Sequence, residues 1–365
     1  MTPDSALGSW FLPGSAMVHP EILRAMEQSV ISSPRPETAN LLARLRPPLQ
    51  ALFRTAGEVF ITAGTATGLM EAAIRSGVEE RVLVVSGGFW GDRFAEVARA
   101  CGKDVVRVMV HPGRTIEPEH LLQFLDGPEV DAVALVHSET STGALAPLAE
   151  LVPVVRARKN LHVLVDAAGS IGGLPVETDL WGLDFVFASS HKALALPPGM
   201  ALGVASPRFL ERARKMPARG LMHDVAALTE DSRLDRGTPP PQAFALLQQL
   251  ARIQAAGGVE SRWRHHHELL TRVEEWVMLH PEVRLLAPEG RRSWTVSCLV
   301  LPGGHSANEI VAKMGEAGWM IATAHGELAD RAILIGHMGE ANVANLARLL
   351  DALGHVLGLP RTLHG

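Results

Sequence analysis

The chain of 365 residues contains no tyrosine and only two cysteines, Cys101 and Cys298. Without tyrosine, any role that a phenol plays in other proteins must be filled by a different side chain or left unfilled. The two cysteines lie far apart in the sequence, which excludes a disulfide framework and the short spacings of metal or redox motifs. Two buried free thiols in a reducing cytoplasm are therefore expected.

Charge and long hydrophobic runs are also scarce. Charged residues make up 20% of the chain and the net charge is −5, so no basic surface for nucleic acid or an anionic membrane is expected. The first residues lack the basic and apolar segments of a signal peptide, and no apolar run is long enough to cross a bilayer. The composition predicts a cytoplasmic protein that binds neither nucleic acid nor membrane.

What the chain does contain is a series of short, apolar, β-rich runs separated by helical patterns. Runs that are apolar throughout are typical of strands buried on both faces, and helices between them predict βαβ crossovers. The sequence therefore predicts an α/β fold built on a mainly parallel sheet. The expected strands are 81–86, 105–110, 132–137, 162–166, 184–188 and 201–205, and a helix is expected over residues 19–30.

A second unit is expected after the three prolines at 239–241. A long helical stretch follows them, is interrupted at Gly257-Gly258 and continues to about Leu279. Three further strands are expected at 294–300, 320–322 and 333–335. We therefore predict a large domain over residues 16–255, a smaller C-terminal α/β domain over 256–365, and an N-terminal segment, 1–15, that packs near the active site.

Two ionisable residues stand at the ends of expected strands. Asp166 ends the run 162–166, and Lys192 follows the run 184–188. Because sites in parallel sheets form at the carboxyl ends of strands, the two should lie close together. A lysine that forms a Schiff base and a carboxylate that keeps a pyridine nitrogen protonated are what pyridoxal phosphate chemistry needs. The alternatives are a helix N-cap for Asp166 and a solvated lysine, although small and apolar neighbours argue against the second.

Four other segments have both a functional and a structural interpretation. The loop 63–68, ahead of a helix expected near Leu69, either binds phosphate or is an ordinary capped loop. Trp90 either lies on a flat cofactor ring or belongs to the core. The polar segment 137–143 either contacts a ligand or forms a turn. The three histidines at 265–267 are expected to be solvated rather than to bind metal, because consecutive helical residues do not share a face.

Taken together, these segments resemble the class V aminotransferases of the pyridoxal phosphate-dependent fold type I superfamily, and among them the alanine–glyoxylate and serine–pyruvate group. The resemblance implies a large domain with a mainly parallel, seven-stranded sheet between helices, a smaller C-terminal α/β domain, and a homodimer with a shared active site. The motifs that carry it are Leu12-Pro13-Gly14, Gly64–Thr67 with Met70-Glu71, Gly88–Arg93, His137–Gly143, Val165-Asp166, Lys192–Leu194 with Pro197–Gly199, Thr238-Pro239 and Ile335–Gly339.

The resemblance implies roles for the matching positions around the cofactor, pyridoxal 5′-phosphate. Lys192 would hold the cofactor as a Schiff base and move the proton, and Asp166 would pair with the pyridine nitrogen. Trp90 would stack on the ring, and Ser141 or Thr142 would contact its oxygen. The phosphate would be held by Thr65, Ala66, Thr67 and His191, with Thr238 reaching it from the other subunit.

Substrate contacts are implied at Gly14, Ser15 and position 334. The family usually has an arginine at position 334, which clamps the substrate α-carboxylate through two hydrogen bonds; this chain has Leu334. Either another arginine has taken over, with Arg35 and Arg236 as candidates, or the substrate is not an ordinary α-amino acid. A second departure is Asp235, which stands where relatives commonly have a tyrosine near the partner-subunit phosphate contact.

The expected activity is transfer of an amino group from a small amino donor to a keto acid or aldehyde such as glyoxylate or pyruvate. A lyase or desulfurase of the same fold is an alternative, but neither cysteine lies in a recognisable mobile loop. A non-catalytic homologue that binds the cofactor is another. Retention of both Lys192 and Asp166 counts against it, because binding alone needs no electron sink. No metal site is expected.

Overall fold

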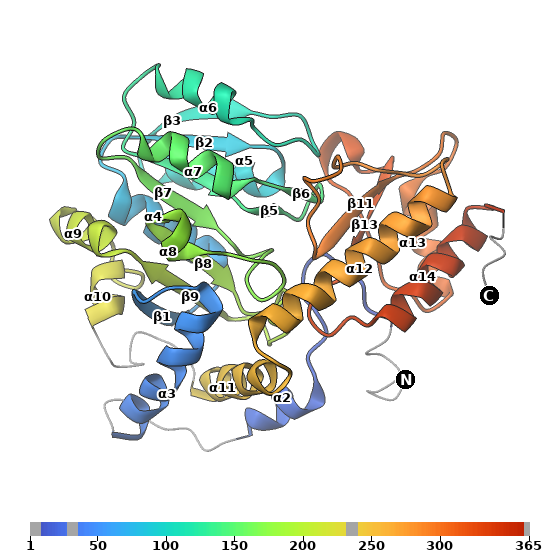
Figure 1. Ribbon diagram of the computed structural model, residues 1–365, viewed down its shortest axis with the longest axis horizontal. Helices are drawn as coiled ribbons and strands as arrows, with labels where there is room; N and C mark the ends of the chain where they lie inside the picture. The colour runs from blue at the N-terminus through green and yellow to red at the C-terminus, as the bar shows by residue number, and fades with distance from the viewer. Residues whose placement is uncertain (1–8, 28–35, 231–239, 361–365) are drawn as a thin grey trace.

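The computed structural model describes residues 9–27, 36–230 and 240–360, which form two α/β units side by side (Figure 1). A seven-stranded sheet with helices on both faces forms the larger unit, and a four-stranded sheet forms the smaller one. This confirms the predicted fold class.

The larger sheet has the order β1-β9-β8-β7-β4-β2-β3. All neighbouring strands are parallel except β9, which runs opposite to both β1 and β8. The strands expected for this sheet are present. Strand β1 is an additional strand that the sequence did not predict, because its apolar run is short. The strands are β1 (Glu58–Ala63), β2 (Arg81–Ser86), β3 (Asp104–Met109), β4 (Ala132–Val136), β7 (His162–Asp166), β8 (Phe185–Ser189) and β9 (Met200–Ala205), with a separate hairpin of β5 (Ser138–Glu139) and β6 (Ala144–Leu145).

Alternate residues of the strands enter two separate hydrophobic cores. In β7, Val163 and Val165 pack against one set of helices, while Leu164 packs against the other. This burial on both faces explains why the strands read as continuous apolar runs. One core holds α3 (Pro36–Phe53), α6 (Pro118–Leu125), α7 (Leu148–Arg156) and α11 (Pro240–Ala255), and the other holds α4 (Ala66–Gly77), α5 (Phe89–Ala100), α9 (Pro207–Lys215) and α10 (Val225–Glu230).

The smaller sheet is antiparallel, with the order β10-β11-β13-β12. Ile333 and Ile335 face the helices of this unit, while Leu334 faces the other way, into an apolar cluster with Ala193 and Ala195 of the larger unit. The elements are β10 (Arg284–Leu285), β11 (Val296–Val300), β12 (Ala322–Thr323) and β13 (Ala332–Gly336), with α12 (Val259–Leu279), α13 (Ala307–Glu316), α14 (Val343–Val356) and the 3₁₀ turn η1 (Gly326–Leu328).

The chain passes from α11 to α12 through Gly257 and Gly258, whose φ angles of 98° and 81° suit glycine. This turn lies at the predicted boundary near residue 256, and the division into domains stays a prediction. The N-terminal segment crosses between the two units. The Phe11 carbonyl accepts a hydrogen bond from Gly336 N at 2.7 Å, and Ala16 N donates to the carbonyl of His191 at 2.8 Å.

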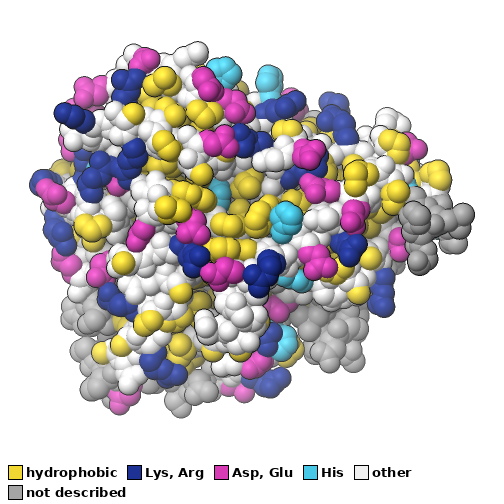
Figure 2. All heavy atoms as spheres, in the orientation of Figure 1, with side chains coloured by type: hydrophobic (Ala, Val, Ile, Leu, Met, Phe, Trp, Pro, Cys, Tyr) yellow, Lys and Arg dark blue, Asp and Glu magenta, His cyan; other side chains and the backbone are white. Residues whose placement is uncertain are grey.

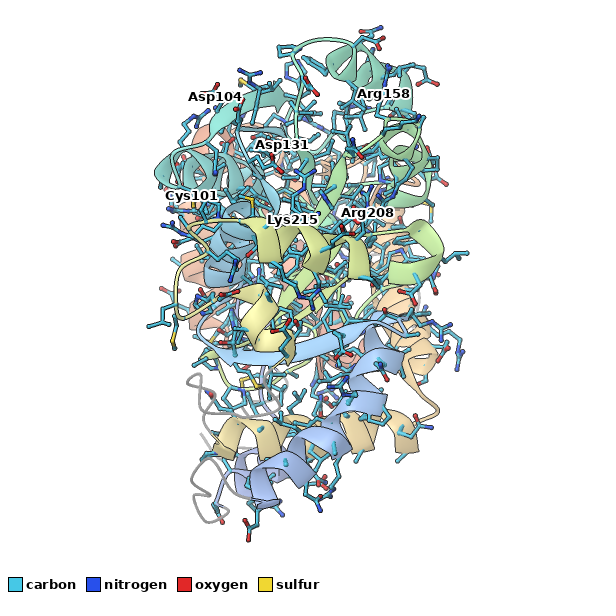
Figure 3. The ribbon with its side chains drawn as sticks, turned by 90° about the vertical axis from the view of Figure 1, so that its left-hand side faces the viewer. Cys101, Asp104, Asp131, Arg158, Arg208 and Lys215 are labelled. Atoms are coloured by element: carbon cyan, nitrogen blue, oxygen red, sulfur yellow. The ribbon has the colours of Figure 1, made fainter. Side chains whose placement is uncertain are left out.

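Several local expectations need correction. The helix expected over 19–30 is α2 (Pro20–Ala25), and residues 28–35 lie outside the described part of the chain. Both thiols are free and Cys298 is buried, but Cys101, at the end of α5, is only partly buried (Figure 3). The histidines at 265–267 are not uniformly solvated, because His266 is fully buried. Helix α12 packs against both units through the face that carries His266, while His267 lies on its exposed face.

Figure 2 shows basic and acidic side chains interspersed over one face of the molecule. None of the helices in the described ranges is both long and apolar enough to cross a membrane, and the same residues contain no cluster of three or more His, Cys, Asp or Glu side chains suited to a metal ion.

A buried ion cluster closes the end of the larger sheet opposite to the strand ends that carry Asp166 and Lys192. The side chain of Asp184 is 1% exposed and lies 2.9 Å from the guanidinium nitrogens of both Arg156 and Arg208; Figure 3 labels Arg208. One of its oxygens also accepts from Val163 N at 2.8 Å. Burial alone would raise the pKa of Asp184, but His162, Arg208 and Arg156 together lower it well below its usual value.

We expect Asp184→Asn to lower the free energy of unfolding by about 2 kcal/mol at neutral pH, since it removes the buried charge that pairs with the partly exposed Arg156 and Arg208. The pKa of Asp184 is depressed in the folded state, so its contribution is present above about pH 4 and is lost as the pH falls further. Denaturant unfolding from pH 7 to pH 3 should show the two proteins converging in acid. Asp104→Asn, in an exposed pair with Arg81, should change little. A constant difference between the two proteins across this pH range would contradict the assignment.

Candidate active site

A cavity of about 160 Å³ lies where β4, β7 and β8 end and where α4 and α5 begin. This is the carboxyl edge of the sheet, where the strand-end motifs were expected to meet. The cavity brings together residues from five separate parts of the sequence. They are Thr65, Ala66, Thr67, Trp90, Val136, Ser138, Thr140, Asp166, Ala168, Gly169, Ser189, His191 and Lys192.

Lys192 lies in a tight loop that follows β8 and is 5% exposed. Its Nζ donates to the Thr140 hydroxyl at 3.0 Å and to the Pro13 carbonyl at 3.4 Å, and lies 5.0 Å from the centre of the Trp90 ring. Burial lowers the pKa of Lys192, while the carboxylates of Asp166 and Glu139 oppose this effect. A lysine in such surroundings is a better nucleophile, because more of it is uncharged near neutral pH.

Asp166 is the last residue of β7 and is 3% exposed. Its Oδ1 accepts a hydrogen bond from Ala168 N at 2.8 Å. Burial raises the pKa of Asp166 to about 6, and the Ala168 N–H and the charge of Lys192 only partly offset this effect. Both the local cap and the catalytic interpretation are therefore compatible with its position, but its place on the cavity wall favours a carboxylate directed at a ligand.

Trp90 is held in place at the first turn of α5 by Glu139. The Oε2 atom of Glu139 accepts from the backbone N–H groups of Trp90 at 3.0 Å and Gly91 at 3.2 Å. The indole Nε1 donates to the Thr140 hydroxyl at 2.9 Å. Residue 88 must be glycine here, since a Cβ would lie 2.5 Å from the Ser141 hydroxyl. The orientation of the Trp90 ring is thus fixed by hydrogen bonds to both the backbone and the side chain of this residue.

Of the three hydroxyl residues at 140–142, Thr140 lines this cavity, whereas Ser141 and Thr142 do not. Ser141 donates to Glu139 Oε1 at 2.5 Å and accepts from Phe89 N at 3.0 Å, so it is engaged in bracing α5. Thr142 instead lines a separate cleft of about 590 Å³. The sequence predicted that this segment contacts the ligand but could not select the residue that lines the cavity, because the turn after β5 breaks the alternation that strand periodicity would supply.

The cavity wall carries polar groups that lack hydrogen-bond partners. Ser189 Oγ and His191 Nδ1 are buried and have no hydrogen-bond partner in the described part of the chain. Thr65 is the N-cap of α4, yet its side chain makes no capping bond, so the first N–H groups of this helix have no side-chain partner from their cap. Buried polar groups without partners are costly, and a phosphate at a helix N-terminus would satisfy such donors. The residues present therefore fit pyridoxal phosphate.

The remaining predicted site residues lie elsewhere. Gly14 and Ser15 are not on the cavity wall, although the carbonyl of the preceding Pro13 contacts Lys192. Leu334 is fully buried in β13, with Cys298 and Ala322 as its cross-strand neighbours. Thr238 lies outside the described residues, so its predicted phosphate contact stays a prediction. Ser189 was not predicted; its only signal in the sequence is its place at the end of a buried strand.

A buried lysine and aspartate at the carboxyl edge of a mainly parallel sheet, together with an aromatic ring and a helix N-terminus, are the arrangement of pyridoxal phosphate-dependent enzymes. Residues 23–333 match the aminotransferase class-V family, and the chain belongs to that family. Membership makes it an aminotransferase and implies pyridoxal phosphate as its cofactor.

The relatives cover nearly the whole chain. It is 31% identical to an uncharacterized aminotransferase of Methanocaldococcus jannaschii, over 93% of this chain and 90% of that protein. It is 28% identical to (S)-ureidoglycine–glyoxylate transaminase of Bacillus subtilis, over 90% and 85% of the two chains. The crystal structure of alanine–glyoxylate aminotransferase from Nostoc sp. superposes with a TM-score of 0.89 at 27% identity and covers 95% of this chain and 94% of that one.

Proposed function

We propose that this aminotransferase moves an amino group from a small amino donor to glyoxylate, pyruvate or a similar keto acid or aldehyde, with pyridoxal phosphate bound covalently to Lys192. The observation that carries the proposal is the buried Lys192 Nζ on the same cavity wall as Asp166. Two of the similar proteins are named for transfer to glyoxylate, which supports that acceptor class.

When bound, pyridoxal phosphate supplies an electron-accepting ring for the bond broken at the donor's Cα. Within the proposal, the protein does the rest. Lys192 Nζ would hold and move the proton at the donor's Cα, as a base and then an acid. Asp166 would keep the pyridine nitrogen protonated, and Trp90 would pack against the ring. The N-terminus of α4, with His191 and Ser189, would hold the phosphate.

Borohydride reduction of the cofactor-loaded protein, followed by peptide mass spectrometry, tests the proposed linkage. The adduct should be on Lys192, and an adduct on another lysine would refute the assignment. A panel of amino donors with glyoxylate or pyruvate then tests the reaction. Conversion of the cofactor to its amine form supports transamination. Release of ammonia or sulfide would indicate a lyase, and a loaded protein that reacts with no donor would indicate a cofactor-binding homologue without catalysis.

The proposal includes a cytoplasmic homodimer with a shared active site. Its support is the family resemblance, in which Thr238 of one subunit reaches the phosphate of the other. Sedimentation of the loaded protein should give a dimer. Co-expression of Lys192→Ala chains with Thr238→Ala chains should restore part of the activity if sites are shared. A fully active monomer would contradict this part of the proposal.

We further propose that the amino donor is not an ordinary α-amino acid. An α-carboxylate would need a cation, and no arginine is present among the described residues that line the cavity. At position 334, where the resemblance implies an arginine, Leu334 is instead enclosed by the apolar side chains of Val296, Cys298 and Met338. A carboxylate buried next to such a surface would be left without a partner, at a large cost in free energy.

Wild-type protein should therefore use alanine or serine with a kcat/KM below about 10⁴ M⁻¹s⁻¹, the lower end for efficient enzymes. Leu334→Arg should raise the use of alanine relative to the native donor, while Leu334→Met, which conserves volume, should not. Thermal unfolding of both variants would show whether the buried guanidinium is tolerated. Efficient use of alanine or serine by the wild type would contradict the proposal, and Arg35 and Arg236 would then be the residues to replace.

A further inference from the structure

The loop that carries Lys192 has every backbone carbonyl from residue 191 to 194 occupied by a donor. The carbonyl of His191 accepts from Ala16 N, and that of Lys192 accepts from Ala195 N, both at 2.8 Å. The next two are held by side chains. Arg262 Nη2 donates to the Ala193 carbonyl at 2.5 Å, and Gln249 Nε2 donates to the Leu194 carbonyl at 2.8 Å. The backbone on both sides of the lysine is thus fixed.

The loop needs this support because part of it has an unfavourable conformation. Ala195 has a φ of 53°, in the left-handed region that residues with a Cβ rarely adopt. Gly339, from the smaller unit, packs directly against it, and a Cβ on Gly339 would lie 2.8 Å from that of Ala195. Such conformations persist only where the surroundings enforce them. Loosening the contacts around Ala195 would therefore release the turn that follows Lys192.

Arg262 links this loop to both units of the molecule. It lies on α12 with a side chain 12% exposed, and it also donates to the carbonyls of Gly172 in the larger unit and Gly339 in the smaller one, each at 3.2 Å. Its charge is balanced by Glu340, whose Oε1 lies 3.3 Å from Arg262 Nη1 and also accepts from Gln249 at 3.1 Å. One carboxylate therefore holds both side chains that grip the lysine loop.

The buried His266 fixes the same region from the next turn of α12. Its Nδ1 donates to the carbonyl of Arg262 at 2.7 Å, and its Nε2 accepts from Gly339 N at 3.0 Å. These two partners require a neutral ring with the proton on Nδ1. Burial, followed by the charge of Arg262, lowers the pKa of His266 well below its usual value, which agrees with that state.

We propose that Arg262 and Gln249 are positioning residues for Lys192, which clamp the backbone of Ala193 and Leu194 so that Nζ stays beside Thr140. Neither side chain lines the cavity, so neither is a catalytic residue. Because Arg262 also binds the loop 339–340 that follows β13, the position of Lys192 depends on how the smaller unit sits against the larger one. The effect of the clamp on catalysis rests on the proposed function of Lys192, whereas the clamp itself does not.

Two variants remove the clamp while conserving size or charge. Arg262→Lys keeps a cation beside Glu340 but cannot form the forked set of contacts to three carbonyls. Gln249→Met removes the donor to Leu194 with little change in volume, and it serves if Arg262→Lys does not fold. The matched control is Arg252→Lys, because Arg252 binds Glu340 at 3.4 Å and Glu21 at 2.7 Å but none of the four loop carbonyls.

The first measurement uses protein without cofactor. A neutral amine-reactive reagent is applied across a range of pH, and labelling of Lys192 is followed by peptide mass spectrometry. Arg262→Lys and Gln249→Met should shift the midpoint of the labelling profile and change the rate several-fold, while Arg252→Lys should match the wild type. Thermal unfolding of all three variants gives their changes in stability. If Arg262 and Gln249 had a merely structural role, labelling of Lys192 would change only as far as stability does.

The second measurement is the rate at which added pyridoxal phosphate becomes covalently attached to Lys192. Both clamp variants should be slower by roughly 10- to 100-fold, as expected for a reacting group displaced by about an ångström. Clamp variants that behave like Arg252→Lys in both measurements would overturn the inference. If the wild type forms no adduct on Lys192, the proposed function fails, while the labelling profiles still decide whether the clamp exists.

Discussion

Replacing Lys192 with alanine is expected to lower kcat by about 10³-fold or more while the protein still binds pyridoxal phosphate. The loss has two sources, since the covalent linkage disappears and proton transfer at Cα loses its base. General acid–base catalysis alone contributes roughly 10²- to 10⁴-fold. Cofactor binding should persist, because Trp90, Asp166 and the N-terminus of α4 remain. Single-turnover rates with the best donor, together with equilibrium dialysis of the cofactor, measure the two effects separately.

Lys215→Ala is the matched control. The side chain of Lys215 on α9 (Figure 3) is 74% exposed and pairs with Glu211, so this variant should behave as the wild type does. Partial rescue of Lys192→Ala by a small primary amine in solution would identify the missing group as a base. Activity of Lys192→Ala within a few-fold of the wild type would show that another residue carries the proton.

Asp166→Asn is expected to keep cofactor binding and to lower the rate of transamination by roughly 10²-fold or more, which corresponds to about 3 kcal/mol. Asparagine can still accept the hydrogen bond from Ala168 N, so the local turn should remain intact. What it cannot do is hold a proton on the pyridine nitrogen through an opposite charge. The comparison therefore isolates the charge of Asp166 from its capping role.

The pH dependence of this pair of proteins gives a second test. In the protein without cofactor, the pKa of Asp166 is raised to about 6, so the group gains a proton and loses its charge as the pH falls below that value. A protonated pyridine nitrogen next to the carboxylate stabilises the charge, so in the loaded enzyme the loss should occur at lower pH. Wild-type activity should approach that of Asp166→Asn in acid. Near-equal activity of the two at neutral pH would show that Asp166 is only a cap.

Long apolar strands and strand-end residues were predicted well, because both depend on short-range pattern. The run 162–166 is β7, buried on both faces, and Asp166 stands at its end as expected. Selection among neighbouring residues was less successful. Thr140, rather than Ser141 or Thr142, reaches the cavity, since the turn after β5 directs Ser141 toward Glu139 and α5. A turn has no fixed period, so the sequence could not make this choice.

The histidines on α12 show the same limit. Helical geometry predicts that the consecutive histidines at 265–267 do not share a face and would not bind a metal together. The prediction that they are solvated is wrong for His266, because α12 packs against both units and its neighbours on that face come from residues 339–341. Burial by a segment more than seventy residues away leaves no local mark on the sequence.

The sequence by itself determined the α/β fold, the family and the strand-end positions of Lys192 and Asp166, because each follows from strand pattern or from motifs that stay together along the chain. Only the tertiary structure decided that Thr140 links Trp90 to Lys192 and that Leu334 faces an apolar cluster. It also placed Arg262 and Gln249 on the carbonyls that follow the lysine. These are contacts between segments far apart in sequence, and they are set by how the two sheets and α12 pack together, which no local pattern encodes.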